Sequence, residues 1–262
     1  MIQVEFANNV VNVLKKDANV IGLAVAGSWI SDELDEFSDL DLILVTKEKI
    51  SGDKSKMLWY ANSFGDLLNG FTGEHVGEPR VLICLYDNPS LHVDIKFVTL
   101  GEFKIRVENP VILLDTDGLL KDAIEQSSAQ FPYPDYQWIE DRFWIWVHYA
   151  LLKIGRGEYF EAIDFFGFVR MVVLGPLLHI KNKNLPRGVR KVETQLDVKD
   201  FEQLKLTLAS HNRKSLIAAL TNMIDLYRSL QNELFTSEIL RQEKTEKAVI
   251  AYLEKIKNVG EN

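Results

Sequence analysis

The first 130 residues of the chain switch between two kinds of hydrophobic pattern. Apolar residues between positions 3 and 16 recur at helical spacing and predict a helix. The run VIGLAVAG at residues 20–27 is continuously apolar, which is typical of a buried strand. In DLDLILV at residues 39–45 the pattern alternates, so the first leucines share one face of a strand and the two aspartates share the other. A helix therefore leads into two strands.

The pattern becomes helical again between residues 53 and 68, and we expect Gly70 to end that helix. RVLICLY at residues 80–86 and LHVDIKFV at residues 91–98 predict two more strands. The DNPS segment between these strands is rich in turn-forming residues, so it predicts a tight connection. The first half of the chain thus mixes strands with helices.

The second half of the chain has only helical patterns. They predict helices over residues 136–154, 158–180, 198–209, 212–235 and 238–257. The character of the sequence changes at FPYPDY, residues 131–136, which we interpret as a domain boundary. The predicted class is α+β: a mixed β-sheet flanked by helices in residues 1–130, followed by an all-α helical bundle in residues 131–262.

Composition narrows the possible environments and partners. The single cysteine, Cys84, excludes an intramolecular disulfide and a cysteine-based zinc cluster, and it fits a reducing cytoplasm. A formal net charge of −8 disfavours unspecific binding to nucleic acid. We see neither a signal-peptide pattern nor a run of roughly 18 uncharged apolar residues that would span a membrane. We therefore expect a cytoplasmic protein with no nucleic-acid or membrane partner.

Candidate chemistry gathers around three of the predicted strands. Gly27 and Ser28 follow the first strand, Asp39 and Asp41 lie in the second, and Asp94 lies in a later one. Each feature by itself is common in turns and at solvated strand edges. Because residues i and i+2 of a strand project to the same side, Asp39 and Asp41 present two carboxylates together. The occurrence of all three features together predicts a functional site.

Clustered carboxylates indicate a cation between them. Such groups repel one another strongly unless a cation compensates their charge. Mg²⁺ prefers oxygen ligands and commonly bridges one or two carboxylates to substrate phosphates. A glycine lets the backbone approach a phosphate closely, and a neighbouring serine hydroxyl can bond its oxygens. We therefore expect Mg²⁺, or Mn²⁺, together with a nucleoside triphosphate as co-substrate.

The order of these motifs resembles a known superfamily. GS, an interval, SDLDL and a later lone aspartate in HVDIKF are similar to the pattern of DNA polymerase β-type nucleotidyltransferases, over roughly residues 20–100. Within that superfamily the chain resembles the bacterial branch of aminoglycoside and lincosamide nucleotidyltransferases and minimal antitoxins. The segments VENPVILLDTDG, WIEDRFWIWVHY and KIGRGEYFEAIDF resemble a bacterial group of two-domain proteins. The resemblance implies a nucleotidyltransferase domain in residues 1–130.

The resemblance also assigns roles to individual residues. It implies that Gly27 and Ser28 form the phosphate-binding turn and that Asp39 and Asp41 are paired metal ligands. Asp94 becomes the third carboxylate, which in such enzymes either ligates a metal or takes the proton from the acceptor hydroxyl. All three aspartates are thus candidate catalytic residues and candidate metal ligands.

Other candidates surround this set. Family members often have a basic residue and a second glycine after the GS pair, whereas this chain continues with WISD at residues 29–32, which implies a weaker grip on the triphosphate. Lys96, two residues after Asp94, either neutralises phosphate charge as a co-substrate ligand or pairs with Asp94. Arg80 either faces the site or lies exposed at a strand end. His92 is expected to be a partly buried structural histidine or to face the site.

The aromatic segment WIEDRFWIWVHY allows two interpretations. Its acids, Glu140 and Asp141, either provide a general base beside an acceptor pocket or lie on the surface as partners of Arg142. Aromatic residues at helical spacing are more often core.

Three functions fit these observations. The first is transfer of a nucleoside monophosphate from ATP or another triphosphate to a hydroxyl of a small molecule, with release of pyrophosphate. The second is an antitoxin-type partner that binds or nucleotidylates a protein, and the third is a nucleotide-binding module without turnover. The second half of the chain is large for an antitoxin, which favours the first. The acceptor, the base specificity and the oligomeric state stay open.

Overall fold

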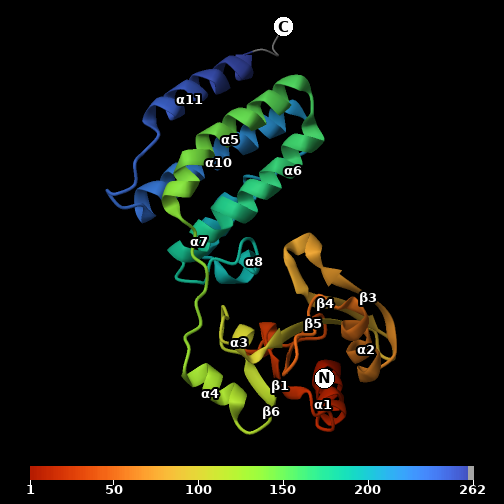
Figure 1. The fold of residues 1–262 in the computed structure, drawn as a ribbon. Coiled ribbons are helices and arrows are strands. Elements are labelled where there is room, and N and C mark those ends of the chain that lie inside the picture. The colour runs from red at the N-terminus through yellow and green to blue at the C-terminus, as the bar shows by residue number, and fades with distance from the viewer. Residues whose placement is uncertain (259–262) are drawn as a thin grey trace. The chain divides into compact units, whose positions relative to one another are not determined.

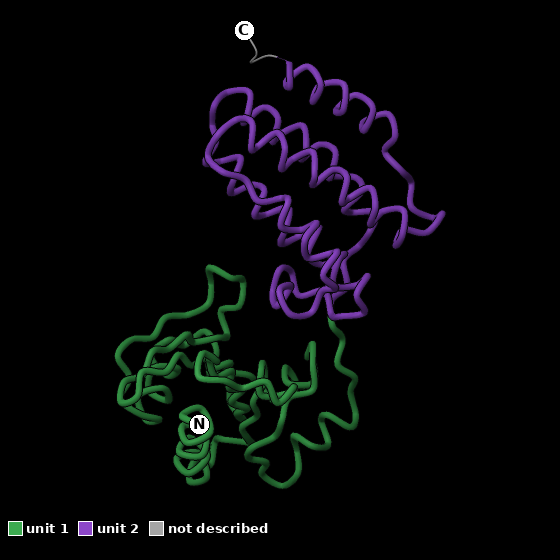
Figure 2. Tube along the Cα trace, turned by 180° about the vertical axis from the view of Figure 1, so that it is seen from behind, with its two compact units in different colours: residues 1–131 green, residues 132–262 purple. Residues whose placement is uncertain are grey.

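A computed structural model describes residues 1–258 and divides the chain into two compact units. The first unit runs from residue 1 to residue 131, and the second begins at Pro132. Figure 2 shows each unit as a continuous stretch of chain. The two are described separately below.

The first unit is built on a six-stranded mixed sheet. Its strands are β1 (Val20–Val25), β2 (Leu40–Thr46), β3 (Leu67–Gly73), β4 (Glu78–Tyr86), β5 (Leu91–Thr99) and β6 (Val111–Asp115). They lie in the order β3-β4-β5-β2-β1-β6, and the β2–β5 pair is parallel while the other pairs are antiparallel. The predicted mixed sheet is confirmed.

Helices cover the two faces of this sheet unequally (Figure 1). On one face, α1 (Ile2–Leu14) and α2 (Lys54–Phe64) pack their apolar side chains against the large core of the unit. On the other face, the short helices α3 (Leu100–Phe103) and α4 (Leu119–Glu125) cover a smaller apolar cluster. The alternation in β2 sends Leu40, Leu42 and Leu44 into the large core, so the side chain between two of them, Asp41, points to the other face.

In this unit one helix boundary was predicted wrongly, and two strands were missed. The helix expected to reach residue 68 ends at Phe64, and the leucines that extended its stripe belong to the edge strand β3. Asp53 caps the start of that helix by accepting a hydrogen bond from the Lys56 backbone N–H. The short strand β6 was also missed, because its five residues carry no alternation of burial.

The regular elements in the described residues of the second unit are all helices, as predicted. Its elements are α5 (Tyr136–Arg156), α6 (Tyr159–Val169), a π-helical turn (Arg170–Leu174), α7 (Gly175–Lys181), α8 (Val192–Gln195), α9 (Val198–Lys205), α10 (Arg213–Leu234) and α11 (Glu243–Asn258). Two of the five Phe, Trp and Tyr side chains of the WIEDRFWIWVHY segment, Phe143 and Trp144, are buried in the core, while Trp138 and Tyr149 are exposed. Phe143 stacks on Tyr227 at 3.6 Å between ring centroids. The α+β class is confirmed.

One helical run is more apolar than the sequence pattern led us to expect. Within the described residues, Tyr159–Lys181 is long and apolar enough to cross a membrane, with a mean hydropathy of 1.6 over 18 residues. Half of that window is buried inside the protein, and its apolar side chains join the core of the second unit. The run therefore has the character of a core helix, and its length and composition are weak evidence for a membrane span.

Neither interpretation of Glu140 is correct. Its side chain is only 1% exposed and accepts hydrogen bonds from the Tyr227 hydroxyl, the Gln231 amide and the Gln242 backbone N–H. The carboxylate ties α5 to α10 and to the segment before α11. Its role is therefore structural. A buried carboxylate is tolerated when hydrogen-bond donors satisfy its lone pairs in this way.

Candidate functional site

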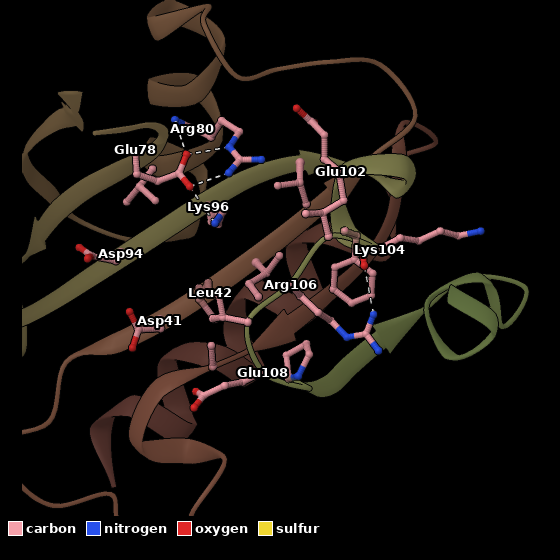
Figure 3. Close-up of a pocket in the computed structure, with 18 of the residues that line it drawn as sticks. Asp41, Leu42, Glu78, Arg80, Asp94, Lys96, Glu102, Lys104, Arg106 and Glu108 are labelled. Atoms are coloured by element: carbon pink, nitrogen blue, oxygen red, sulfur yellow. Dashed lines mark hydrogen bonds and ion pairs between the residues drawn. The ribbon is translucent and has the colours of Figure 1, made fainter. Parts of the chain in front are cut away.

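The sheet topology brings two of the predicted carboxylates together. β2 and β5 are parallel neighbours, and Asp41 is the direct register partner of Asp94. Both side chains are half-buried and lie next to each other on the sheet face away from the large core (Figure 3). Directly paired residues of neighbouring strands are among the closest in a sheet. The sequence identified both residues, but their pairing follows from the parallel β2–β5 contact.

The predicted Gly-Ser turn lies against Asp41, one of these two carboxylates. Gly27 begins a short 3-10 turn, η1 (Gly27–Trp29), directly after β1. Its φ is +64°, and a Cβ at this position would lie 2.0 Å from Oδ2 of Asp41. The Ala26 backbone N–H donates to the Asp41 carbonyl at 2.9 Å, which fixes the end of β1 against β2. Only glycine lets the turn and the carboxylate come this close.

The surroundings of Asp94 shift the pKa of its carboxyl. Burial raises the pKa of its carboxyl, and the negative charge of Asp39 adds to that rise. The opposing influence is His92, whose Nε2 lies 3.0 Å from Oδ1 of Asp94. His92 is therefore a partner of the candidate site, and its side chain is 52% exposed rather than partly buried. Asp39 lies immediately before β2 and is half-buried.

A buried amide that the sequence did not single out holds the loop before Asp39. The Gln3 side chain of α1 is 1% exposed, and its Nε2 donates to the carbonyls of Asp35 at 2.9 Å and Ser38 at 2.8 Å. The Ser38 hydroxyl also donates to the Asp35 carboxylate at 2.8 Å. These bonds fix the loop that leads into the aspartates. No local pattern marks Gln3, because its partners are more than 30 residues away.

A pocket of about 740 Å³ opens beside the carboxylates, within the first unit. Of the six candidate site residues, Asp41, Asp94 and Lys96 line it. Its other charged lining residues are Glu78, Arg80, Glu102, Lys104, Arg106 and Glu108. Its apolar walls come from β2, β5 and the segment between α3 and β6. A site of this size and mixed lining is suited to a small organic molecule.

Lys96 pairs with Glu78 and not with Asp94, and its role toward phosphate stays a prediction. Its Nζ lies 2.9 Å from Oε2 of Glu78, the first residue of β4. Glu78 also accepts two bonds from Arg80, at 2.7 Å from Nε and 2.6 Å from Nη2 (Figure 3). The bond from Arg80 holds the pKa of Glu78 well below its usual range, at about 2, with a further contribution from Lys96. The sequence analysis did not single out Glu78: Arg80 lies only two residues away on the same strand, but Lys96 lies on β5 and comes near only in the folded sheet.

Arg106 fixes the outer wall of the pocket. Its Nη2 donates to the carbonyls of Ile124 at 3.0 Å and Ser127 at 2.7 Å, and its Nη1 donates to the Ser127 hydroxyl at 2.6 Å. Nε donates to Asn109 Oδ1 at 2.8 Å. The guanidinium therefore joins the segment after α3 to the end of α4, which is a structural use of its planar set of donors.

The carboxylates suit a divalent cation whose coordination shell is completed by the substrate. Within residues 1–258 there is no group of three or more His, Cys, Asp or Glu side chains placed to hold a metal ion by themselves. Asp41 and Asp94 form a facing pair instead, with Asp39 close enough to influence the pKa of Asp94. Mg²⁺ usually takes one or two protein carboxylates and completes its shell with water and substrate phosphates. The residues present fit that mode, and the lack of a side chain at Gly27 makes space for the Asp41 carboxylate.

These features define a class. A mixed sheet with a Gly-Ser turn after one strand and aspartates on adjoining parallel strands has the nucleotidyltransferase fold of the DNA polymerase β type, as the resemblance implied. The chain belongs to the streptomycin adenylyltransferase family, whose family model matches residues 2–256. The protein is therefore an enzyme of the nucleotidyltransferase class, and its family supports transfer to a small-molecule acceptor.

Solved structures with a similar chain course include an aminoglycoside 6-adenyltransferase from Bacillus subtilis, at 17% identity, 98% coverage of both chains and a TM-score of 0.41. A nucleotidyltransferase-like protein from Exiguobacterium sibiricum is 13% identical, with 98% of this chain and 89% of that chain covered and a TM-score of 0.35. A spectinomycin adenyltransferase from Enterococcus faecialis is 12% identical, with 97% and 99% covered and a TM-score of 0.31. Similarities at this level carry no inference about substrates. No curated protein sequence matches the chain.

Proposed function

We propose that this protein transfers a nucleoside monophosphate from ATP to a hydroxyl of a small-molecule acceptor, in a reaction that depends on Mg²⁺ or Mn²⁺ and releases pyrophosphate. The observation that carries the proposal is the meeting of Gly27, Asp41 and Asp94 at one point of the sheet, beside a pocket. Membership of an adenylyltransferase family supports ATP as the donor. We place the reaction in the cytoplasm, where ATP and Mg²⁺ are abundant.

The position of each residue suggests its proposed role. Asp41 and Asp94 would hold the divalent cation, with Asp39 beside them as the third candidate ligand, and the cation would supply charge stabilisation at the reacting phosphorus. The Gly27–Ser28 turn receives the donor phosphates through backbone N–H groups and the serine hydroxyl. Lys96 faces the donor phosphates from β5 as a fixed positive charge.

Asp94 is also the candidate base for the acceptor hydroxyl. The raised pKa of its carboxyl makes it a better proton acceptor than an ordinary aspartate, because a base is most effective when its pKa approaches the working pH. His92, hydrogen-bonded to Asp94 at 3.0 Å, orients that carboxylate.

Binding of the donor tests this proposal without knowledge of the acceptor. Calorimetry of the full chain with ATP, GTP, CTP and UTP should show that binding requires Mg²⁺ or Mn²⁺, with ATP the tightest. EDTA should abolish the heat of binding, because the carboxylates then repel the triphosphate. Equal affinity for the triphosphate with and without a divalent cation would refute the metal-bridged site. A preference for a triphosphate with another base would replace ATP as the proposed donor and leave the rest of the proposal unchanged.

A second experiment identifies the acceptor. Streptomycin is the first molecule to test, since it names the family to which the chain belongs. Mass spectrometry of the acceptor after incubation with ATP and Mg²⁺ would detect the nucleotidyl adduct, and pyrophosphate release would confirm the stoichiometry.

A further inference from the structure

Lys96 lies where it could disable the candidate metal site. It is two residues after Asp94 on β5, so both side chains project to the same face, roughly 6.6 Å apart along the strand. Asp41 sits directly across from Asp94 on β2. A lysine carries its charge on a flexible four-carbon stem. Left unrestrained, the ammonium would be drawn to the two carboxylates and would compete with a divalent cation.

The structure shows this ammonium bonded elsewhere. Its Nζ lies 2.9 Å from Oε2 of Glu78, whose side chain is 26% exposed. Glu78 is itself fixed, because Arg80 donates to both of its carboxylate oxygens at 2.7 and 2.6 Å. A forked arginine–carboxylate pair is the most strongly oriented ion pair available to side chains. Figure 3 shows this ion cluster beside the carboxylate pair and separate from it.

Glu78 also keeps its charge under all ordinary conditions. Its pKa is lowered to about 2, chiefly by the bond from Arg80, so the carboxylate stays ionised wherever the protein would work. The hold on Lys96 therefore does not depend on pH near neutrality.

We propose that Glu78 is a positioning residue that holds the Lys96 ammonium away from Asp41 and Asp94, and thereby prevents this ammonium from competing with a divalent cation for the two carboxylates. The inference rests on the proposed function, because it assumes that the pair binds the metal. It adds a role for a residue outside the metal-binding motif. Arg80 acts with Glu78 by fixing the direction of its carboxylate.

The test measures the binding of Mn²⁺ to the full chain. Electron paramagnetic resonance quantifies the free ion. Glu78→Gln keeps the shape of the side chain and removes its charge, so Lys96 is released. We expect the dissociation constant for Mn²⁺ to rise about tenfold, in the range typical of changes that disturb the surroundings of a metal site. The double variant Glu78→Gln/Lys96→Met lacks the competing ammonium and should return to wild-type affinity.

Glu102→Gln is the matched control. Glu102 lines the same pocket, so the variant removes one negative charge there without releasing Lys96. Its carboxylate accepts from the Thr99 backbone N–H at the start of α3, and glutamine can serve the same capping role. We expect Mn²⁺ affinity within about twofold of wild type. Melting curves of each variant report whether the fold is retained.

The outcomes separate this inference from the proposed function. Equal weakening in Glu78→Gln and Glu102→Gln would show a general effect of pocket charge and would overturn the inference. So would a double variant that stays weak. If Glu78→Gln does not fold, Lys96→Met alone decides: it should bind Mn²⁺ at least as tightly as wild type, and a loss would overturn the inference. Wild-type protein that binds no Mn²⁺ would instead overturn the metal role of the carboxylates, and the inference with it.

Discussion

Replacement of Gly27 by alanine should separate function from stability. The added Cβ would lie 2.0 Å from Oδ2 of Asp41, where ordinary contact begins at 3.4 Å. The obstructing atom is the end of a side chain, so the carboxylate can turn aside by roughly 1 Å or more. Misplacement on this scale is costly for a binding constellation, because positions must hold to about 0.5 Å. We therefore expect Mg²⁺-dependent affinity for ATP to fall roughly 10–100-fold.

The stability cost should be small by comparison. A left-handed backbone at φ +64° costs an L-residue roughly 1–2 kcal/mol, and the lower entropy of the unfolded alanine chain offsets about 0.4–1 kcal/mol. A net loss of about 1 kcal/mol is expected in urea unfolding. Gly118→Ala is the matched control, since Gly118 has φ +74° and nothing within 4 Å of an added Cβ. It should lose similar stability and keep full ATP affinity.

Calorimetry with ATP and Mg²⁺, beside urea titrations of the same preparations, measures both quantities. The reasoning fails if Gly27→Ala binds ATP as wild type does, or if Gly118→Ala loses as much affinity as Gly27→Ala.

Three further changes test other parts of the structure. Glu140→Ala should destabilise the protein by roughly 3 kcal/mol in urea unfolding, because the buried donors of Tyr227, Gln231 and Gln242 lose their acceptor; a loss below about 1 kcal/mol would contradict the buried network. Gly175→Ala should cost roughly 3 kcal/mol or more, since its Cβ would meet the Gly188 carbonyl oxygen at 2.2 Å, and normal stability would show that this backbone contact is wrong. The stability difference between wild type and Glu78→Gln should be full above about pH 4.5 and shrink as the pH falls toward about 2, because the folded-state pKa is depressed and protonation removes the ion pairs; a constant difference down to about pH 3 would refute this.

Much of the fold follows from local pattern. The α1 helix, the four strands β1, β2, β4 and β5, and the long helices of the second unit were all visible as periodicities of apolar residues. The edge strand β3 was missed because Leu67 and Leu68 continue a helical stripe past Gly65, where the chain turns out of the helix. A pattern of apolar positions cannot distinguish a helix that continues from a strand that starts.

The candidate site also contains residues that the sequence marked and residues that it did not. Gly27, Asp41 and Asp94 were visible because each belongs to a short motif on its own strand. Glu78, the partner of Lys96, and Gln3 were not, because their interactions with Lys96 and with the loop before Asp39 join elements that only the folded chain brings together. Glu140 was misjudged for a similar reason: its acceptor role depends on residues 87 or more positions away.

Nucleotidyl transfer itself tests the central claim most directly. The full chain is incubated with ATP, Mg²⁺ and the acceptor that mass spectrometry identifies, and the nucleotidylated acceptor and pyrophosphate are then quantified. The account predicts equal amounts of nucleotidylated acceptor and pyrophosphate from wild type, and neither product in EDTA or from Asp41→Asn or Asp94→Asn, although both variants keep the melting temperature of a folded protein. Product from either variant at the wild-type rate would contradict the assignment of this carboxylate pair to catalysis.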